Sequence, residues 1–478
     1  MAGAPASSAT AARSRRKRTD SELRRTESRE AVRTEALDLR ATELARFYQG
    51  KVETVPKVPI RHLSDFAVWY TPGIAEVSRV IHHDPDEAFH LTGRWNTIAI
   101  LTDGSRVLGL GDVGPQAALP VMEGKALLFK WLGGVDAVPL PVSTASPEEL
   151  IETALRIAPA FGGINLEDIA SPKCFHVLEE LQKRSTIPVW HDDQLGTAAA
   201  TVAGLINALR LTNRSIKPLR TVLLGAGAAN LVTARLLIAM GHDPTTLSLV
   251  DHRGILHPDR EDMDELLVRN RWKYHVAIET RGGGRRGGLP EALEGADVLL
   301  AASTPNADLV SRDAVRSMAP EPIVFALANP TPEIWPAVAK SAGAAVVATG
   351  RSDFPNQVNN SLVFPAVFRG VLDARARSIP DEIVLSAARE LAAHAEDKGL
   401  TPTHILPTME EVEVFPHVAA AVATTAVTLG IARTRKTRAE FLARAQQRMR
   451  RSARLVRTLL DSGLIAPMPR PHPKESKR

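Results

Sequence analysis

Residues 221–240, TVLLGAGAANLVTARLLIAM, decide the fold of this chain. An apolar run of strand length ends at Gly225, and a helical pattern begins a few residues later, near Asn230. Gly225 and Gly227 permit a tight turn, and the N–H groups of the first helical turn can bind a pyrophosphate. Asp251 ends the next apolar run, where an acidic residue can bind ribose hydroxyls. The stretch therefore predicts a dinucleotide-binding unit of strand, turn and helix.

Three positions bear on whether a dinucleotide is bound and on which one. Asn230 stands where the usual fingerprint has its third glycine, so an ordinary strand–helix turn remains the alternative. Asp251 favours NAD because its carboxylate repels a 2′-phosphate, whereas Arg253 could support NADP. The cofactor is therefore expected to be NAD or NADP, with NAD slightly preferred. The residues expected to bind it are Gly225, Ala226, Gly227, Ala228, Ala229, Asn230 and Asp251.

Apolar runs of strand length continue on the C-terminal side of this unit and alternate with helical patterns. The alternation predicts a doubly wound, parallel α/β sheet of the Rossmann type. The runs end in Asp, Ser, Asn or Gly, the residue types that work at the carboxyl edge of such a sheet. They are LSLVD (247–251), DVLLAAS (297–303), PIVFALANP (322–330) and AAVVATG (344–350).

A second set of elements precedes the dinucleotide unit. Residues 97–115 read as strand, turn and strand, with a hairpin turn expected at Asp103-Gly104. Helical patterns and short apolar runs follow, and two of these runs end in acids, at 163–169 and 187–193. These elements predict an α/β domain on the N-terminal side of the dinucleotide sheet.

The acids at the ends of these two runs suggest a metal site. Glu167 and Asp168 follow the first run, and Asp192 and Asp193 follow the second. Three carboxylates would hold Mg²⁺ or Mn²⁺ and leave positions for a substrate that chelates through a hydroxyl and a carboxylate. Helix caps and solvated surface acids are the alternative, and no Cys/His spacing suggests zinc.

Two further side chains could move protons. Lys125 lies in an otherwise apolar stretch, VMEGKALLF, and burial near a metal could lower its pKa into the range of a general base. A lysine at a helix start that reaches solvent is the alternative. Tyr70 precedes a Thr-Pro-Gly turn, where it could be a positioned acid or a half-buried packing residue.

Composition narrows the class of protein. A length of 478 residues suits two domains with appendages, and one cysteine, Cys174, excludes an internal disulfide and favours a reducing compartment. No apolar run reaches the roughly 20 residues of a membrane helix, so a cytoplasmic protein is expected.

The net charge of +5 comes from basic segments at 13–33 and 433–478, whereas the middle is acidic. Nucleic-acid binding is therefore not expected of the core.

Seven stretches taken together resemble the malic enzymes, particularly the shorter bacterial type. They occur in the family's order and cover about residues 35–425. The stretches are WYTPGIAEV (69–77), LTDGSRVLGLGDVGPQAALPVMEGKALLFK (101–130), GGINLEDIASPKCF (162–175), IPVWHDDQLGTAAA (187–200), LLGAGAAN (223–230), FALANPTPEI (325–334) and ATGRSDFPNQVNNSLVFPAVFRGVLDARA (348–376).

The resemblance implies a role for each matching residue. Tyr70 matches the family's general acid, and Lys125 matches its general base. The residues that match metal ligands are Glu167, Asp168 and Asp193, with Asp192 beside them. The residues that match groups at the substrate and the nicotinamide are Asn329 and either Asn359 or Asn360, and Arg106 resembles an arginine that binds the substrate carboxylate in some members.

The resemblance also implies an architecture and a reaction. It places a basic tail at 1–33, a catalytic domain at 34–195, an NAD(P)-binding domain at 196–376, helices packing back at 377–430, and a basic helix and tail at 431–478. The expected reaction is oxidative decarboxylation of (S)-malate to pyruvate and CO₂, by a homodimer or higher oligomer. The alternatives are a malolactic-type enzyme that releases lactate, and a non-catalytic binding or regulatory protein.

Overall fold

The computed structural model describes residues 37–107, 109–144 and 146–470, which form two units. The larger unit spans Pro56–Leu455 and carries all the residues singled out above as candidates for a site. The smaller unit joins the chain up to Val55 with the chain from Val456 onward. The predicted basic tail at 1–33 lies outside the described residues.

The first sheet of the larger unit is parallel and four-stranded, in the order β2-β1-β3-β4. Its strands are β1 (Thr97–Thr102), β2 (Asp136–Pro141), β3 (Gly163–Leu166) and β4 (Val189–His191). Leu101 lies opposite Leu166, and Leu166 lies opposite His191. The neighbouring strands β3 and β4 therefore end side by side.

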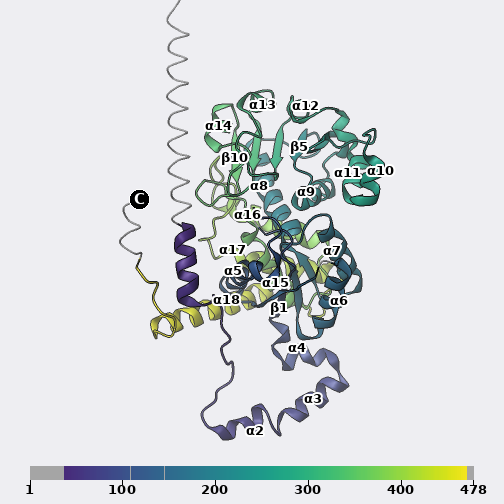
Figure 1. Cartoon of the computed structure of the whole chain (residues 1–478). Coiled ribbons are helices and arrows are strands. Elements are labelled where there is room, and N and C mark those ends of the chain that lie inside the picture. The colour runs from purple at the N-terminus through teal and green to yellow at the C-terminus, as the bar shows by residue number, and fades with distance from the viewer. Residues whose placement is uncertain (1–36, 108, 145, 471–478) are drawn as a thin grey trace, which may run out of the picture. The chain divides into compact units, whose positions relative to one another are not determined.

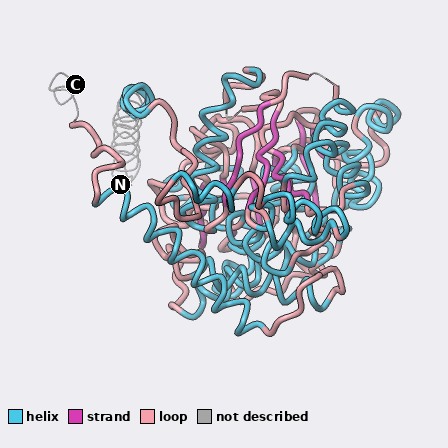
Figure 2. Tube along the Cα trace, turned by 90° about the horizontal axis from the view of Figure 1, so that it is seen from below, coloured by secondary structure: helices cyan, strands magenta, loops and turns pink. Residues whose placement is uncertain are grey.

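Figure 2 shows helices around the strands, in agreement with the fully buried apolar run of β1. They include α5 (Gly114–Gly133), α6 (Pro147–Ile157), α7 (Lys173–Arg184) and α15 (Phe364–Ala374). The ring of Phe129 on α5 contacts the rings of Phe364 and Phe368 on α15, at centroid distances of 4.6 and 5.3 Å. These aromatic contacts join the first sheet to a helix that lies more than 200 residues later in the chain.

The second sheet has six strands in the order β10-β9-β8-β5-β6-β7, and the short β7 is antiparallel to β6. Its strands are β5 (Thr221–Leu224), β6 (Leu247–Asp251), β7 (Gly254–Ile255), β8 (Val298–Ala301), β9 (Ile323–Ala326) and β10 (Val346–Thr349). All five predicted parallel strands are present. The strand order changes direction between β5 and β8, and this confirms the predicted doubly wound α/β fold.

The remaining helices connect and flank the two sheets (Figure 1). Those between and after the strands are α8 (Thr197–Leu211), α9 (Ala228–Ala239), α10 (Met263–Arg269), α11 (Arg271–Thr280), α12 (Leu289–Leu293), α13 (Arg312–Arg316), α14 (Pro336–Ser341), α16 (Asp381–Asp397), α17 (Val414–Thr428) and α18 (Arg438–Asp461). Within the described residues, no helix is both long and apolar enough to cross a bilayer.

The prediction of a hairpin at Asp103-Gly104 is wrong. β1 ends at Thr102, and the chain beyond it makes a single bridge, between Val107 and Gly111, before α5 begins. The Asp103 carboxylate pairs with Lys173 at the start of α7, and a Cβ on Gly104 would collide with the Gly114 backbone. Contacts with distant residues therefore turn the chain away from β1 and into a helix.

The segment before the first sheet leaves apolar side chains exposed. It contains α2 (Phe66–Trp69), α3 (Ile74–His83) and α4 (Ala88–Leu91), and none of the residues in these three helices is buried. The exposed apolar side chains include those of Leu63, Phe66, Val68, Trp69 and Ile74. These apolar side chains lie close together in the sequence and are not scattered singly. Exposed apolar patches of this kind usually mark an interaction site.

In the smaller unit, a helix at residues 37–48 lies beside the chain that follows α18. The Tyr48 hydroxyl donates a hydrogen bond to the carbonyl oxygen of Ala466 at 3.0 Å, and Arg40 donates to the carbonyl oxygen of Pro469. These contacts hold the two ends of the described chain together within that unit.

A buried charge cluster lies behind the first sheet. The fully buried Arg369 on α15 pairs with Asp373 at 2.9 Å and donates to the Asn96 side chain at 2.6 Å. Arg448 on α18 also pairs with Asp373, and its guanidinium lies 4.1 Å from the centre of the Trp95 ring. Asp373 therefore supplies the negative charge that keeps these guanidiniums stable inside the protein.

We expect Asp373→Ala to lower the free energy of unfolding by about 3 kcal/mol or more, because it leaves Arg369 buried without its counter-charge. Denaturant unfolding followed by circular dichroism measures the change. The matched control is Asp313→Ala, which removes the exposed partner of Arg316 on α13 and should cost less than about 1 kcal/mol. Equal losses in the two variants would contradict this account of the cluster.

Candidate active site

Carboxylates from two neighbouring strand ends meet at the carboxyl edge of the first sheet. Glu167 and Asp168 follow β3, and Asp193 lies in a π-helical turn, η5 (Asp192–Gly196), that follows β4. One oxygen from each of these three carboxylates lies within 4.8 Å of the others. The N–H of Asp168, which has a φ of +53°, donates to the Asp193 carboxylate at 3.0 Å. The structure thus brings together the three carboxylates expected to bind a metal.

Lys125 projects from α5 into this cluster. Its Nζ lies 2.6 Å from a Glu167 oxygen and also pairs with Asp192. The same ammonium lies 4.4 Å from the centre of the Phe364 ring, at the start of α15. Asp192 accepts a second hydrogen bond from the Trp190 indole at 3.0 Å. Lys125 is therefore a buried cation held by carboxylates and an aromatic face.

The charges of the cluster decide the pKa of Lys125. Burial acts to lower its pKa, but the charges of Asp192, Glu167 and Asp193 outweigh burial and raise the pKa above its ordinary value. The expected lowering of the lysine pKa was for a lysine beside a bound metal, so the raised pKa of the chain alone leaves it as a prediction. Burial also raises the pKa of Glu167 and of Asp192, even though Lys125 opposes this effect.

This donor set fits a hard divalent cation. The cluster offers only carboxylate oxygens, some of them buried, and such ligands suit Mg²⁺ or Mn²⁺ better than softer metals. A cation would also relieve the repulsion and desolvation that raise the carboxyl pKa values. With the carboxylate charge shared by the cation, burial would then act to lower the pKa of Lys125, as a general base requires.

The dinucleotide motif lies at the carboxyl edge of the second sheet, where the strand order reverses. Gly225 follows β5 with a φ of +97°, and a Cβ there would collide with the backbone of Ala302 after β8. Gly227 precedes α9, and a Cβ there would meet no atom within 4 Å. Ala226, Ala228 and Ala229 complete the turn into the helix, so the backbone remains open to a ligand.

Asn230 compensates for the missing third glycine. Its buried amide donates hydrogen bonds of 2.9 Å to the carbonyl oxygens of Leu224 and Gly225. These bonds connect the first turn of α9 directly to the end of β5. A polar side chain here performs the close helix–strand packing that the glycine normally allows.

The acid at the end of β6 is surrounded by basic residues. Asp251 pairs with Arg260 at 3.0 Å and with Lys273 at 3.3 Å, and it accepts the Arg253 N–H at 2.9 Å. The Arg253 side chain is half exposed and pairs with Asp262 at 3.4 Å. The negative charge of Asp251 is therefore largely balanced, which reduces its repulsion of a 2′-phosphate.

The predicted substrate residues lie at loop ends near these two edges. Asn329, which is exposed, follows β9 and donates to the Gly350 carbonyl oxygen at 3.4 Å. A Cβ on Gly196 would contact the Asn360 side chain, so Asn360 lies beside η5, whereas the Asn359 amide contacts Met409. Arg106 has an exposed side chain, and its N–H donates to the Asp168 carbonyl oxygen at 3.0 Å.

Tyr70 is the predicted catalytic residue that the structure does not bring to this cluster. It ends α2 in the exposed apolar segment, and 69% of its side chain is accessible to solvent. Cys174 is unsuited to nucleophilic chemistry because burial raises the pKa of its thiol to about 12.

Glu333 is a residue of this region that sequence reasoning missed. Its buried carboxylate accepts N–H groups from Ser303 at 2.7 Å and Ala328 at 3.1 Å. These bonds join the loops that follow β8 and β9, which flank the dinucleotide motif. The sequence signal is an acid in the apolar surroundings of FALANPTPEI, but one of its partners, Ser303, lies 30 residues away.

Comparisons with known proteins agree with this geometry. The family model described as "Malic enzyme, N-terminal domain" matches residues 49–182, and "Malic enzyme, NAD binding domain" matches residues 195–427. A "Bifunctional malic/malolactic enzyme" from Bacillus subtilis is 44% identical over 82% of this chain and 94% of its own length. The chain belongs to the malic enzyme family.

Further malic enzymes support the assignment. The "NAD-dependent malic enzyme" of Geobacillus stearothermophilus is 44% identical over 80% of this chain and 78% of its own length. The "NADP-dependent malic enzyme" of Halomonas elongata is 42% identical over 84% and 96%. The crystal structure of the Entamoeba histolytica malic enzyme superposes with a TM-score of 0.89 at 41% identity, covering 93% of both chains.

We expect Asn230→Ala to weaken NADH binding by about tenfold, because two carbonyl oxygens at the dinucleotide turn lose a buried donor. Titration of NADH fluorescence measures the dissociation constant. Arg235→Ala is the matched control, since Arg235 lies on the exposed face of α9 and pairs with Asp381. Unchanged NADH affinity in a folded Asn230→Ala variant would contradict the role of this amide.

Proposed function

We propose that this protein catalyses the oxidative decarboxylation of (S)-malate to pyruvate and CO₂, with reduction of NAD or NADP. The observation that carries the proposal is the buried Lys125 ammonium among the carboxylates of Glu167, Asp192 and Asp193. The membership of the malic enzyme family supports it. On this proposal the metal and proton-transfer residues belong to a domain at 34–195, and the cofactor residues, together with Asn329, Asn359 and Asn360, to a domain at 196–376.

The chain's residues divide the chemistry between them. Glu167, Asp168 and Asp193 would hold Mg²⁺ or Mn²⁺, which when bound supplies a Lewis acid for the substrate oxygens. Lys125, in its neutral amine form, would accept the proton of the malate C2 hydroxyl as the hydride leaves C2. Tyr70 donates a proton to C3 after CO₂ departs. Bound NAD or NADP supplies the hydride acceptor.

Cofactor choice follows from the balanced charge around Asp251. Its pairs with Arg260 and Lys273 reduce the repulsion of a 2′-phosphate, and Arg253 lies two residues away. Relatives named as NAD-dependent and as NADP-dependent both match this chain. We therefore propose that the enzyme uses both dinucleotides, with a slight preference for NAD.

The proposed activity is tested by assaying malate and Mn²⁺ with NAD or NADP while quantifying pyruvate and lactate. One reduced dinucleotide and one pyruvate are expected for each malate consumed. Lactate formed without accumulation of NADH would instead support a malolactic enzyme, an activity that the name of the Bacillus subtilis relative includes. Loss of metal to a chelator should abolish turnover.

Lys125→Ala should lower kcat by about 10²–10⁴-fold, because the proton acceptor is removed, and should leave NADH binding nearly unchanged, because the dinucleotide motif lies on the second sheet. The same coupled assay and NADH fluorescence measure both effects. Lys130→Ala is the matched control, since Lys130 lies on the same helix and pairs with Asp136. Full activity of Lys125→Ala would refute the proposed function.

We also propose that the enzyme is a homodimer in which Tyr70 serves the partner's active site. Two observations support this arrangement. Tyr70 is exposed and lies outside the Lys125 cluster, and the residues around it present an unburied apolar surface that a second copy would cover. A tyrosine held by such an interface would approach a lysine that its own chain does not place nearby.

Mixed dimers of Tyr70→Phe and Lys125→Ala subunits test this arrangement. Each variant alone should be nearly inactive. If the tyrosine acts across subunits, a mixed dimer has one site with both residues intact and should recover about half of the wild-type kcat. Differently tagged, co-expressed subunits allow the mixed dimer to be isolated. A mixed dimer that stays as inactive as its parents would show that Tyr70 acts within its own subunit.

A further inference from the structure

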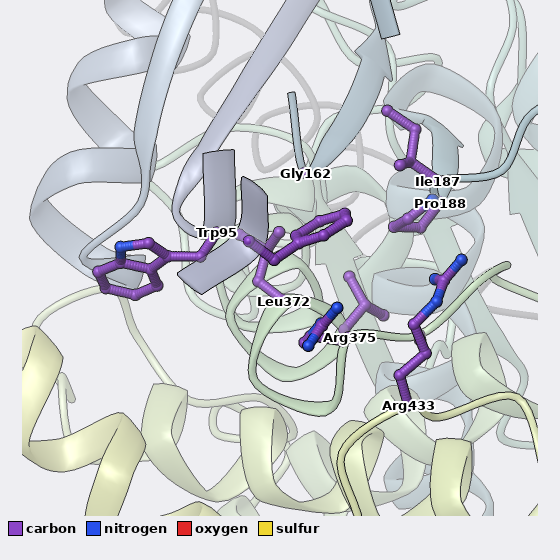
Figure 3. A pocket seen from close by; sticks show the side chains of 10 residues that line it. Trp95, Gly162, Ile187, Pro188, Leu372, Arg375 and Arg433 are labelled. Carbon is purple, nitrogen blue, oxygen red and sulfur yellow. The ribbon is translucent and has the colours of Figure 1, made fainter. Parts of the chain in front are cut away.

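A small hollow lies at the amino-terminal edge of the first sheet (Figure 3). Trp95, Gly162 and Pro188 line it, and they directly precede β1, β3 and β4. The catalytic carboxylates follow the opposite ends of β3 and β4. This hollow is therefore separate from the candidate active site.

Arginines surround the hollow. Arg375 and Arg433 line it, and Figure 3 shows both guanidiniums beside it. Arg94 lies next to it, because the Arg94 and Arg375 guanidiniums lie 4.2 and 4.7 Å from the centre of the same Phe89 ring, which also lines the hollow. Three positive charges thus gather around one partly apolar concavity.

Asp86 balances only part of the positive charge of these three arginines. Its Oδ2 lies 3.4 Å from Arg375 Nη2 and 3.9 Å from Arg433 Nε, and 59% of its side chain is exposed. These ion pairs are long, and solvent weakens them. One exposed carboxylate therefore leaves the three arginines with excess positive charge.

The guanidiniums are oriented but retain unused donors. Arg94 Nε donates to the Phe161 carbonyl oxygen at 3.0 Å, and Arg433 Nη2 donates to that of Thr186 at 3.4 Å. Arg375 Nη1 contacts the His90 ring at 2.7 Å, but its buried Nε has no hydrogen-bond acceptor among the described residues. Burial first, and then the neighbouring Arg433 charge, lower the pKa of Arg94.

We propose that this hollow binds a small anion bearing a carboxylate or phosphate group, held by Arg375, Arg433 and Arg94. Guanidiniums match both groups through paired N–H donors, and Phe89 and Leu372 provide apolar surface beside them. Asp86 occupies the same donors in the unliganded protein and yields them when the anion enters.

The site is connected to the catalytic cluster by one helix. Val371 and Leu372, near the end of α15, line the hollow, and Arg375 follows the helix directly. Phe364, at the start of α15, lies against the Lys125 ammonium. An anion that draws Arg375 inward would shift α15, so bound anion should change the KM for malate.

Calorimetric titration of the full chain tests the site, with inorganic phosphate and succinate as separate probes. We expect at least one probe to bind, Arg375→Gln and Arg433→Gln each to weaken that binding by at least about tenfold, and Asp86→Asn to strengthen it. Arg316→Gln, an exposed arginine on α13, is the control and should bind as the wild type does. The stronger probe identifies the phosphate or the carboxylate class.

Succinate bound at the catalytic site is recognised because malate displaces it and because Arg433→Gln leaves it unchanged. Absence of binding by both probes, or equal affinity in the wild type and folded Arg375→Gln and Arg433→Gln variants, would overturn the proposal. Calorimetry needs no turnover, so this result is independent of the proposed malate chemistry.

Discussion

The ion pairs between Lys125 and the carboxylates at the ends of β3 and β4 are the constraint on which the catalytic half of the structure depends. Burial raises the pKa of Glu167 and Asp192, so these carboxylates need a positive charge to remain ionised. Lys125 supplies it from α5, and the Phe364 ring limits the water around it. Because the parallel strands β3 and β4 end side by side, one lysine can pair with carboxylates that follow both strands.

Both sheets place chemistry at the point where their strand order changes direction. In the first sheet this point lies between β1 and β3, beside Glu167 and Asp168. In the second it lies between β5 and β8, beside Gly225. At such a point the connections leave in opposite directions, and a crevice forms beyond the strand ends. The carboxylate cluster and the dinucleotide motif thus occupy the same topological position in their two sheets.

Sequence reasoning succeeded where the signal is local. Apolar runs that end in Asp, Asn or Gly predicted the parallel strands. The ends of such runs also predicted that Glu167 and Asp168 lie at a sheet edge. Sequence reasoning failed where distant residues decide: the pairing of Asp103 with Lys173 replaced the expected hairpin. The carboxylates that pair with Lys125 were likewise not identifiable as its partners from the sequence. The role of Asn230 was also hidden, because its amide partners become visible only when strand and helix are in place.

The cluster around Asp373 has a consequence for how the protein is made. The first sheet is complete by residue 191, but its buried surface also requires α15 and the Arg448 side chain of α18. A ribosome releases residues in order, so the first half of the chain emerges with the part of its apolar surface that α15 and α18 cover still exposed. The first sheet can therefore reach its final packing only near the end of synthesis, and until then it depends on protection from aggregation.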